Sequence, residues 1–229
     1  MSIKLFDLAA AESDRRFSPY CWRIRMALAH KGLDVETVAW RFTEKEAIAP
    51  TGQGKVPVLV HDGKWLHESW DIANYLEETF PDRPSLFGGV SGKALSRFYS
   101  NVADALSGQI IRFVLLHVYR QLHEQDKAYF RESRERRFKS TLEEVVADRE
   151  ERLQAFRDSL ATLRTTLLQQ DYFGGDSPLY ADYALFGPFQ WARCISPFQL
   201  LEPDDPVAQW RARLQGAFNG LAGSAPGYD

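Results

Sequence analysis

The sequence predicts an α/β domain over residues 1–80, followed by an all-helical domain over residues 91–229. Before residue 80, short strand-like segments alternate with helical segments, whereas after Ser91 strand signals vanish and long helical stretches follow. Between the two parts, residues 81–90 hold two prolines and two glycines among few periodic apolar residues. Such a composition is typical of an interdomain linker.

The first domain is expected to fold as strand, helix, strand, hairpin and helix. A right-handed crossover makes the first two strands parallel, and the hairpin at Asp62-Gly63 adds antiparallel strands. Gly32 is suited to end the first helix, and Pro81 closes the second. This is the order of a thioredoxin-like domain. The expected strands are residues 3–8, 34–40, 56–60 and 64–67, and the expected helices are residues 19–31 and 69–79.

The second domain is expected to consist of long helices. They cover residues 93–122, 126–170, 180–195 and 205–220. The charge-dense segment 131–152 mixes both signs, so we interpret it as the solvated face of these helices and not as a nucleic-acid surface.

Composition and charge narrow the classes of function. The net charge of −3 argues against nucleic acid as the main partner. The only cysteines, Cys21 and Cys194, lie far apart, which disfavours a disulfide framework and indicates a reducing compartment. The first residues lack a signal-peptide pattern, and no apolar run approaches the roughly 18 residues that a membrane helix needs. We therefore expect a cytoplasmic protein with no membrane partner and no bound metal.

The segment Ser18-Pro19-Tyr20-Cys21 follows the first strand and opens the first helix. Ser18 suits the N-cap and Pro19 the first helical position, and capping alone would explain the pair. The same geometry also suits catalysis, because the positive end of a helix stabilises a thiolate and Ser18 can donate a hydrogen bond to it. Redox relatives carry a Cys-x-x-Cys pair here, whereas Cys21 stands alone and is expected to be a small buried residue.

Val56-Pro57 stands at the start of the third strand, where proline is tolerated in a sheet. One alternative is an ordinary trans proline at a strand start. The other is a cis peptide bond that turns the Val56 N–H and C=O toward an extended ligand, so that a tripeptide pairs with them as an added strand.

Glu68-Ser69 ends the hairpin and opens the next helix, with Ser69 expected as the N-cap. In addition, the Ser69 hydroxyl and the helix N–H groups can hold a carboxylate, and Glu68 can meet an ammonium. A carboxylate and an ammonium on one carbon describe a γ-glutamyl group. Lys55 or Gln53 is a candidate for the carboxylate at the opposite end of the ligand.

These motifs resemble the glutathione site of the glutathione S-transferases. The resemblance is carried by SPYCWRIRMAL at residues 18–28, KVPVL at residues 55–59 and Glu68-Ser69. The pattern SxxxWRxRxAL is similar to the zeta class, whereas the chain as a whole looks closer to the bacterial glutathione-dependent β-etherases. That wider likeness is found at residues 69–76, 81–84, 181–183 and 204–206.

The resemblance implies glutathione as co-substrate and a role for each motif. Ser18 matches the thiolate-activating serine, Val56 the backbone partner of the cysteinyl unit, Pro57 the cis-proline, and Glu68-Ser69 the γ-glutamyl clamp. It also implies a homodimer, and Trp65 and Trp70 are candidates for covering a partner.

The chain departs from the family pattern at two positions. Tyr20 replaces the cysteine of the zeta pattern, which weakens an isomerase assignment. Leu179 stands where the family places Ser or Thr, three residues before Asp182, so a reciprocal helix cap is missing and local stability is in doubt.

A hydrophobic aromatic electrophile is the expected second substrate, because the helical half is rich in aromatic residues. In this fold the first long helix of the second domain borders the thiolate, and its apolar stripe supplies Phe98, Val102 and Phe113 as candidate contacts beside Tyr20. His117 lies in the same region and is expected to be structural.

Two classes of function remain open. The first is a transferase of detoxification or aromatic metabolism, which includes β-aryl ether cleavage, conjugation of other electrophiles and cis–trans isomerisation. The second is a carrier or regulator that keeps the fold and binds glutathione without turnover.

Overall fold

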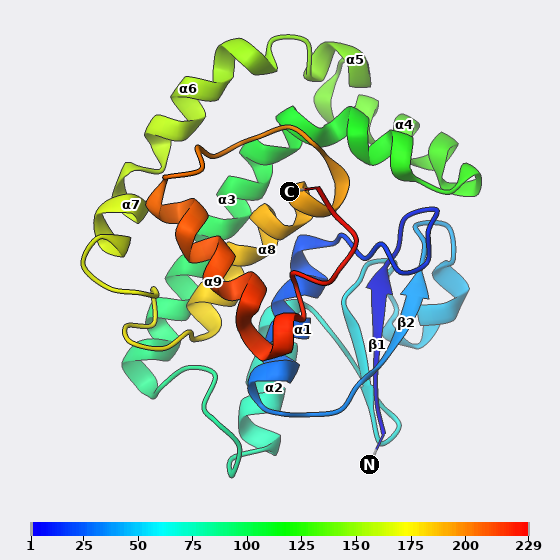
Figure 1. Ribbon diagram of the computed structural model, residues 1–229. Helices are drawn as coiled ribbons and strands as arrows, with labels where there is room; N and C mark the ends of the chain where they lie inside the picture. The colour runs from blue at the N-terminus through cyan, green and yellow to red at the C-terminus, as the bar shows by residue number, and fades with distance from the viewer. Residues whose placement is uncertain (1, 229) are drawn as a thin grey trace.

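The computed structural model describes residues 2–228, and its N-terminal part is built on a four-stranded mixed sheet. The strand order is β2-β1-β3-β4, with β1 parallel to β2 and antiparallel to β3 (Figure 1). The strands are β1 Ile3–Leu8, β2 Glu36–Trp40, β3 Val58–His61 and β4 Lys64–His67. The predicted thioredoxin-like order is therefore confirmed. β3 begins two residues later than expected because Pro57 has no N–H to give to the ladder.

Two helices of this part begin at sequence motifs singled out above. They are α1 Pro19–His30 and α2 Ser69–Thr79. Gly32 follows α1 with a φ of 61°, the left-handed conformation expected of a residue that ends a helix. A 3₁₀ helix, η1 Lys45–Thr51, was not predicted, because Pro50 inside it breaks the helical pattern.

The remaining helices are arranged around α3 Val90–Gln121 and α8 Tyr180–Ile195, which pack against each other (Figure 1). They are α4 Glu124–Phe138, α5 Leu142–Val145, α6 Arg149–Ser159, α7 Ala161–Leu167 and α9 Pro206–Gly220.

The expectation of one helical stretch over residues 126–170 is wrong, since α4, α5, α6 and α7 share it. The first break lies at Lys139, whose φ of 53° is left-handed. Directly after it, Thr141 and Glu144 cap each other's backbone N–H groups and start α5. This T-x-x-E capping box is a helix-start signal that was readable in the sequence.

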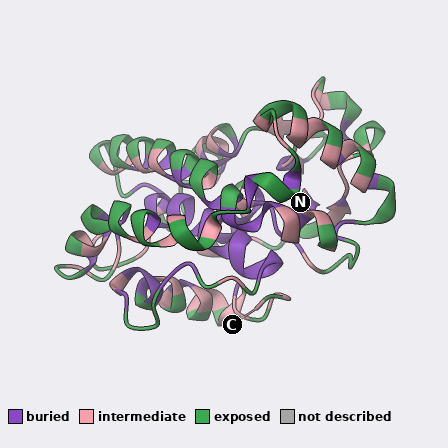
Figure 2. Ribbon diagram, turned by 90° about the horizontal axis from the view of Figure 1, so that it is seen from above, coloured by how far each residue is buried: buried purple, intermediate pink, exposed green. Residues whose placement is uncertain are grey.

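Helix α8 is the centre of the fold, because it is buried along its whole length and packs against both α1 and α3 (Figure 2). Gly187 permits this close packing. A Cβ on Gly187 would lie 2.3 Å from the carbonyl oxygen of Pro19, so only glycine fits beside the first turn of α1. The start of α1 is thereby fixed against the helical part.

Among the described residues, α3 alone is long and apolar enough to cross a membrane by length and composition. The sequence expectation concerned an uninterrupted apolar run, and Asp104 and Arg112 interrupt the apolar residues of α3. The core helix of a soluble protein passes the same test, and Leu106, Ile110 and Val114 of α3 are buried in the hydrophobic core.

The buried Asp182 near the start of α8 corrects another expectation. Its carboxylate accepts hydrogen bonds from the backbone N–H groups of Phe173, Gly174 and Leu179 and from the indole N–H of Trp210, at 2.8–3.0 Å. Four donors therefore satisfy this carboxylate, and the missing hydroxyl at Leu179 leaves no deficit there.

Candidate functional site

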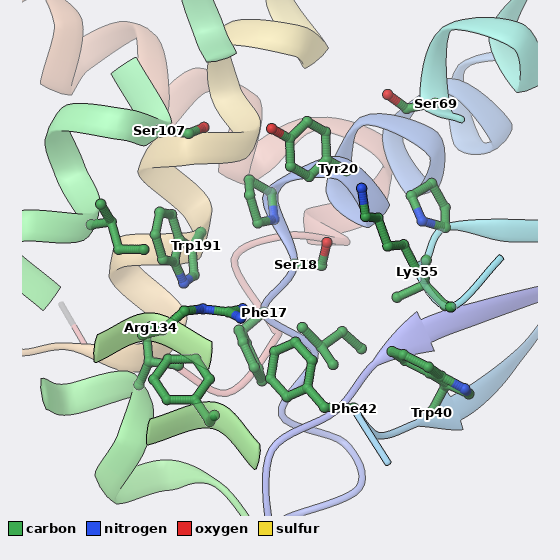
Figure 3. Close-up of a pocket in the computed structure, with 18 of the residues that line it drawn as sticks. Phe17, Ser18, Tyr20, Trp40, Phe42, Lys55, Ser69, Ser107, Arg134 and Trp191 are labelled. Carbon is green, nitrogen blue, oxygen red and sulfur yellow. The ribbon is translucent and has the colours of Figure 1, made fainter. Parts of the chain in front are cut away.

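A cavity of about 540 Å³ opens between the sheet-containing part and the helical part (Figure 3). One wall comes from the start of α1, the loop before β3 and the start of α2, and the other wall comes from α3, α4 and α8. We call these the N-terminal wall and the helical wall. The N-terminal wall includes every residue predicted to hold glutathione, together with Tyr20: Ser18, Gln53, Lys55, Val56, Pro57, Glu68 and Ser69.

Ser18 is the N-cap of α1, as predicted, and its side chain is almost fully buried. Its Oγ accepts a hydrogen bond from the backbone N–H of Cys21 at 3.2 Å. A hydroxyl that accepts through a lone pair keeps its own O–H free to donate. The cavity therefore meets a hydroxyl donor at the positive end of a helix, where a thiolate is stabilised.

Cys21 lies behind this site, away from the cavity wall, and is fully buried. Burial, and next the nearby carboxylate of Asp7, raise the pKa of the Cys21 thiol well above its usual value. It is therefore a protonated, buried side chain at neutral pH, as the sequence predicted, and Ser18 is the residue that faces the cavity.

The Val56-Pro57 peptide bond is cis, as the second of the two alternatives requires. The preceding loop is held by Gln53, whose side-chain oxygen accepts from the Lys55 N–H at 2.6 Å and whose amide donates to the Lys55 carbonyl at 2.9 Å. The Gln53 side-chain amide is therefore hydrogen-bonded within the loop, whereas the Lys55 ammonium points into the cavity (Figure 3). Of the two candidates for the far carboxylate, the geometry favours Lys55.

Glu68 and Ser69 lie at the start of α2, but the N-cap is one residue earlier than expected. Glu68 is the N-cap, with a φ of 64°, and Ser69 is the first helical residue, so the prediction of Ser69 as the cap was off by one position. The N–H groups of the first helical turn are still unpaired within the helix and can hold a carboxylate. The Ser69 carbonyl accepts a hydrogen bond from the Tyr180 hydroxyl at 3.0 Å, which ties this end of α2 to α8.

Tyr20 lies at the seam between the walls and is 38% exposed. The Arg23 guanidinium lies 4.6 Å from its ring centre, and Arg23 also pairs with Asp104 of α3 at 2.7 Å. Burial, and next the Asp104 carboxylate, raise the pKa of the Tyr20 hydroxyl. Tyr20 therefore presents a protonated hydroxyl at neutral pH.

Three of the predicted second-substrate contacts do not line this cavity. Phe98 is 61% exposed, Val102 lies beside it on α3, and Phe113 is buried against Phe156 and Phe198. At about 100° per residue, these positions fall on roughly the opposite side of α3 from the residues that do face the cavity. Those residues are Asp104, Ser107, Gly108, Ile111 and Val118.

The apolar stripe on α3 thus did not identify the face toward the cavity: Phe113 packs in the helical core, whereas Phe98 is exposed. The cavity face of α3 mixes small and polar residues (Asp104, Ser107, Gly108) with Ile111 and Val118, so it carries no continuous apolar pattern. His117 is also outside the lining, and its Nδ1 lies 2.5 Å from the Ser196 hydroxyl, which confirms a structural role.

The helical wall is completed by aromatic residues that the sequence offered only as part of a large aromatic set, and by two arginines that sequence reasoning missed. They are Tyr129, Phe130, Arg134 and Arg137 of α4 and Trp191 of α8, which face Phe17, Trp40 and Phe42 of the N-terminal part. Nothing in their local sequence marks them, because they meet only through the packing of α3, α4 and α8.

Asp126 in the first turn of α4 fixes this wall to the N-terminal part. Its buried carboxylate accepts from the Phe42 N–H at 3.1 Å, the Thr43 N–H at 3.0 Å and the Thr43 hydroxyl at 2.8 Å. We call these three bonds the Asp126 seam. It holds α4 against Phe42, the aromatic residue that borders the cavity from the loop after β2.

Within residues 2–228, no group of three or more His, Cys, Asp or Glu side chains is arranged to hold a metal ion.

Comparison with known proteins gives a consistent result. Residues 94–212 match the family described as glutathione S-transferase, C-terminal domain, and residues 13–84 match its N-terminal domain. Glutathione S-transferase U22 of Arabidopsis thaliana is 26% identical over 204 residues, which cover 86% of this chain and 80% of that protein. A probable glutathione transferase of Aplysia californica is 36% identical over 90 residues, which cover 38% of this chain and 98% of that protein.

Solved structures show the same fold. A glutathione S-transferase of Ceriporiopsis subvermispora in complex with glutathione superposes with a TM-score of 0.82 at 21% identity, covering 99% of each chain. The glutathione transferase GSTFuA3 of Phanerochaete chrysosporium superposes with a TM-score of 0.81 at 23% identity, covering 96% of this chain and 97% of that one.

Proposed function

This chain belongs to the glutathione S-transferase family, and we propose that it activates the glutathione thiol for attack on an apolar, aromatic electrophile. One observation carries the proposal. The residues suited to the three units of glutathione, which lie far apart in the sequence, line one wall of one cavity.

The N-terminal wall offers a fitting group for each part of the tripeptide. Glu68 and the start of α2 suit the ammonium and carboxylate of the γ-glutamyl unit, and the Val56 backbone suits the cysteinyl unit. The Lys55 ammonium, which forms no ion pair with any described residue, suits the glycyl carboxylate. In this pose the cysteine sulfur lies at Ser18.

Ser18 then stabilises the thiolate by two means. Its O–H donates a hydrogen bond to the sulfur of bound glutathione, and the N-terminus of α1 adds partial positive charge. Both favour the charged form and lower the pKa of the glutathione thiol. The thiolate, which is the nucleophile, is thereby available at neutral pH.

We further propose that the electrophile is an aryl ether whose carbon beside the ether oxygen is attacked. The carbon–sulfur bond forms as the carbon–oxygen bond breaks, and the phenolate leaves with the electron pair and takes a proton from water. The aromatic surroundings at Phe17, Phe42 and Trp191 suit an aryl group. Holding both reactants together supplies several kcal/mol by removing the entropy cost of their encounter.

Stoichiometry tests this function. The protein is incubated with glutathione and the 4-nitrophenyl ether of 2-hydroxyacetophenone, and thiol and 4-nitrophenol are measured together. Ether cleavage consumes one thiol for each phenol released. Isomerisation of a maleyl compound without thiol loss would instead favour a zeta-like isomerase, and glutathione binding without turnover of either compound would favour a carrier.

We also propose a cytoplasmic homodimer with a domain division at residues 81–90. Val90, Leu95 and Phe98 are exposed apolar residues near the start of α3, which supports a partner contact there. Trp65 and Trp70 already pack within the chain, against Phe6 and against Phe87 and Tyr180 respectively. Sedimentation equilibrium should give twice the chain mass at micromolar concentration, and a stable monomer would contradict the proposal.

A further inference from the structure

The helical wall of the cavity contains a cation without a counter-charge. Arg134 lies on the inner face of α4, with its guanidinium 4.6 Å from the ring centre of Phe130 and 5.3 Å from that of Phe42. Figure 3 shows its side chain extending across the cavity toward Phe17. The charge is therefore held among aromatic rings at the place where the second substrate is expected.

Two other arginines of α4, Arg131 and Arg136, provide a contrast. Arg131 pairs with Glu135 at 2.7 Å and with Glu143 at 2.9 Å, and Arg136 pairs with Glu132. Within residues 2–228 no carboxylate pairs with Arg134, whose one hydrogen bond runs from a terminal nitrogen to the Ser133 hydroxyl at 2.9 Å.

The Nε of Arg134 is buried and has no hydrogen-bond partner among the described residues. Burial lowers the pKa of Arg134, but an arginine begins so far above neutrality that it stays charged. A buried, charged donor without an acceptor is costly, and an anionic ligand would relieve that cost.

The carboxylates of the cavity lining do not supply this partner. Asp104 is engaged by Arg23 at 2.7 Å, and Glu68 lies on the N-terminal wall at the start of α2. On that wall Lys55 is available for glutathione itself. Arg134, with the exposed Arg137 one turn further along α4, therefore gives the helical wall an excess of positive charge.

We infer that Arg134 binds a carboxylate on the second substrate, so that aromatic electrophiles bearing a carboxylate are preferred over neutral ones. The inference rests on the proposed transferase function and names its substrate class. A planar guanidinium fork matches a carboxylate with two parallel hydrogen bonds. The flanking rings of Phe42 and Phe130 keep the fork in place and leave room beside it for the ring of the substrate.

A matched pair of substrates tests this inference. Glutathione is reacted with 4-chloro-3,5-dinitrobenzoate and with its uncharged methyl ester, in both of which the carbon–sulfur bond forms, the carbon–chlorine bond breaks and chloride leaves. Arg134→Gln should lower kcat/KM for the acid by about 10- to 100-fold, as expected for a lost charged hydrogen-bond pair, and should change it for the ester by less than about threefold. Arg134→Lys should retain part of the preference, and the KM for glutathione should stay unchanged.

Arg136→Gln is the matched control, since it makes the same change on the outer face of α4, away from the cavity, and should leave both substrates unaffected. Equal losses for the acid and the ester in Arg134→Gln would overturn the inference, because they would indicate a structural role. A raised KM for glutathione with both substrates would also overturn it, because Arg134 would then hold the tripeptide.

Binding separates this inference from the proposed function. If the wild-type protein turned over neither compound, the transferase proposal would fail, whereas carboxylate selectivity would still be measured with the unreactive 3,5-dinitrobenzoate and its methyl ester. Quenching of tryptophan fluorescence gives both affinities, because Trp40 and Trp191 line the cavity. Tighter binding of the acid that Arg134→Gln abolishes would support the inference, and equal affinity of acid and ester in the wild-type protein would overturn it.

Discussion

The two walls of the cavity are built by different means. The N-terminal wall is made of short motifs of adjacent residues, Ser18-Pro19, Val56-Pro57 and Glu68-Ser69, each at a helix start or in a loop. It offers a hydroxyl, backbone groups and the charged side chains of Lys55 and Glu68. The helical wall gathers side chains from α3, α4 and α8, and it offers aromatic rings and an arginine.

This difference matches the two ligands: glutathione is the same in every reaction, whereas the second substrate varies. Backbone groups and helix ends recognise a peptide by its own main chain, so few side chains on that wall decide binding. On the helical wall each side chain sets shape and charge, and a single substitution there alters which electrophile fits. We therefore expect glutathione affinity to depend on the N-terminal wall and selectivity for the second substrate to depend on the helical wall.

The largest expected effect comes from cutting the Asp126 seam, which joins the walls. Asp126→Ala leaves the N–H groups of Phe42 and Thr43 and the Thr43 hydroxyl without their acceptor. Urea denaturation should show a loss of about 3 kcal/mol in the free energy of unfolding, as for a buried hydrogen-bond network.

Glu124→Ala is the control for the seam, because Glu124 lies on the same helical turn but is exposed. Its effect should stay within about 0.5 kcal/mol. Equal stabilities of the two variants would mean that the seam does not hold the walls together.

The next largest effect is a loss of kcat/KM on replacing Ser18, for which Ser107 of the helical wall is the comparison. The Ser18 hydroxyl lines the cavity and accepts from the Cys21 N–H, whereas the Ser107 hydroxyl donates to the Ala103 carbonyl at 2.9 Å. Ser18→Ala should lower kcat/KM by about 10- to 100-fold, since a hydrogen bond to a charged group is worth about 1.5–3 kcal/mol.

Ser107→Ala should change kcat/KM by less than about threefold, because its hydroxyl has no proton left for the thiolate. The thiol pKa, measured from thiolate absorbance of bound glutathione, should rise in Ser18→Ala alone. A rise in both variants, or in neither, would place thiolate activation elsewhere.

The contrast between the walls also explains what the sequence could predict. The strands and the hairpin, the Ser18 cap and the helix start at residues 68–69 follow from local rules of capping, turns and proline, whereas cis and trans at Val56-Pro57 stayed open. Each rule involves neighbours in the chain, so the sequence suffices. The N-cap at Glu68, where Ser69 was expected, shows that such rules place a helix start to within about one residue.

The helical wall could not be predicted because its signal is not local. The apolar stripe read on α3 runs from the exposed Phe98 to the buried Phe113, and the cavity uses roughly the opposite face with Ser107 and Gly108. Arg134 was read as part of a solvated, charge-dense stretch. Only the packing of α4 against Phe42 reveals that this charge points inward.

A smaller effect would test this correction on α3. Ile111 faces the cavity and Val102 lies on the other side of the helix. Ile111→Ala removes apolar contact area from the second substrate and should raise its KM by roughly three- to tenfold, while the KM for glutathione stays constant. Val102→Ala should leave both KM values unchanged. A raised KM in Val102→Ala alone would restore the stripe predicted from the sequence.

The smallest expected effect is a change of folding stability with pH at His30, where α1, α8 and the linker meet. His30 of α1 lies 2.6 Å from the Tyr183 hydroxyl of α8 through Nδ1, and its Nε2–H donates to the Ser85 carbonyl in the linker at 3.0 Å. Burial lowers the pKa of His30 from its usual 6.5, despite the opposing Ser85 carbonyl. A lowered folded-state pKa means that folding favours the neutral ring, so its contribution to stability is complete above the unfolded pKa and is lost as pH falls through the folded one.

His30→Gln keeps a neutral donor and acceptor at every pH. The difference in urea midpoint between wild type and variant should therefore shrink from about pH 7.5 to about pH 5, the range over which a histidine charges. A difference that stayed constant or grew toward pH 5 would show that the protonated ring is accepted at this junction, with Nδ1–H donating to Tyr183 and the Tyr183 hydroxyl turning fully to the Pro178 carbonyl, from which it lies 3.4 Å.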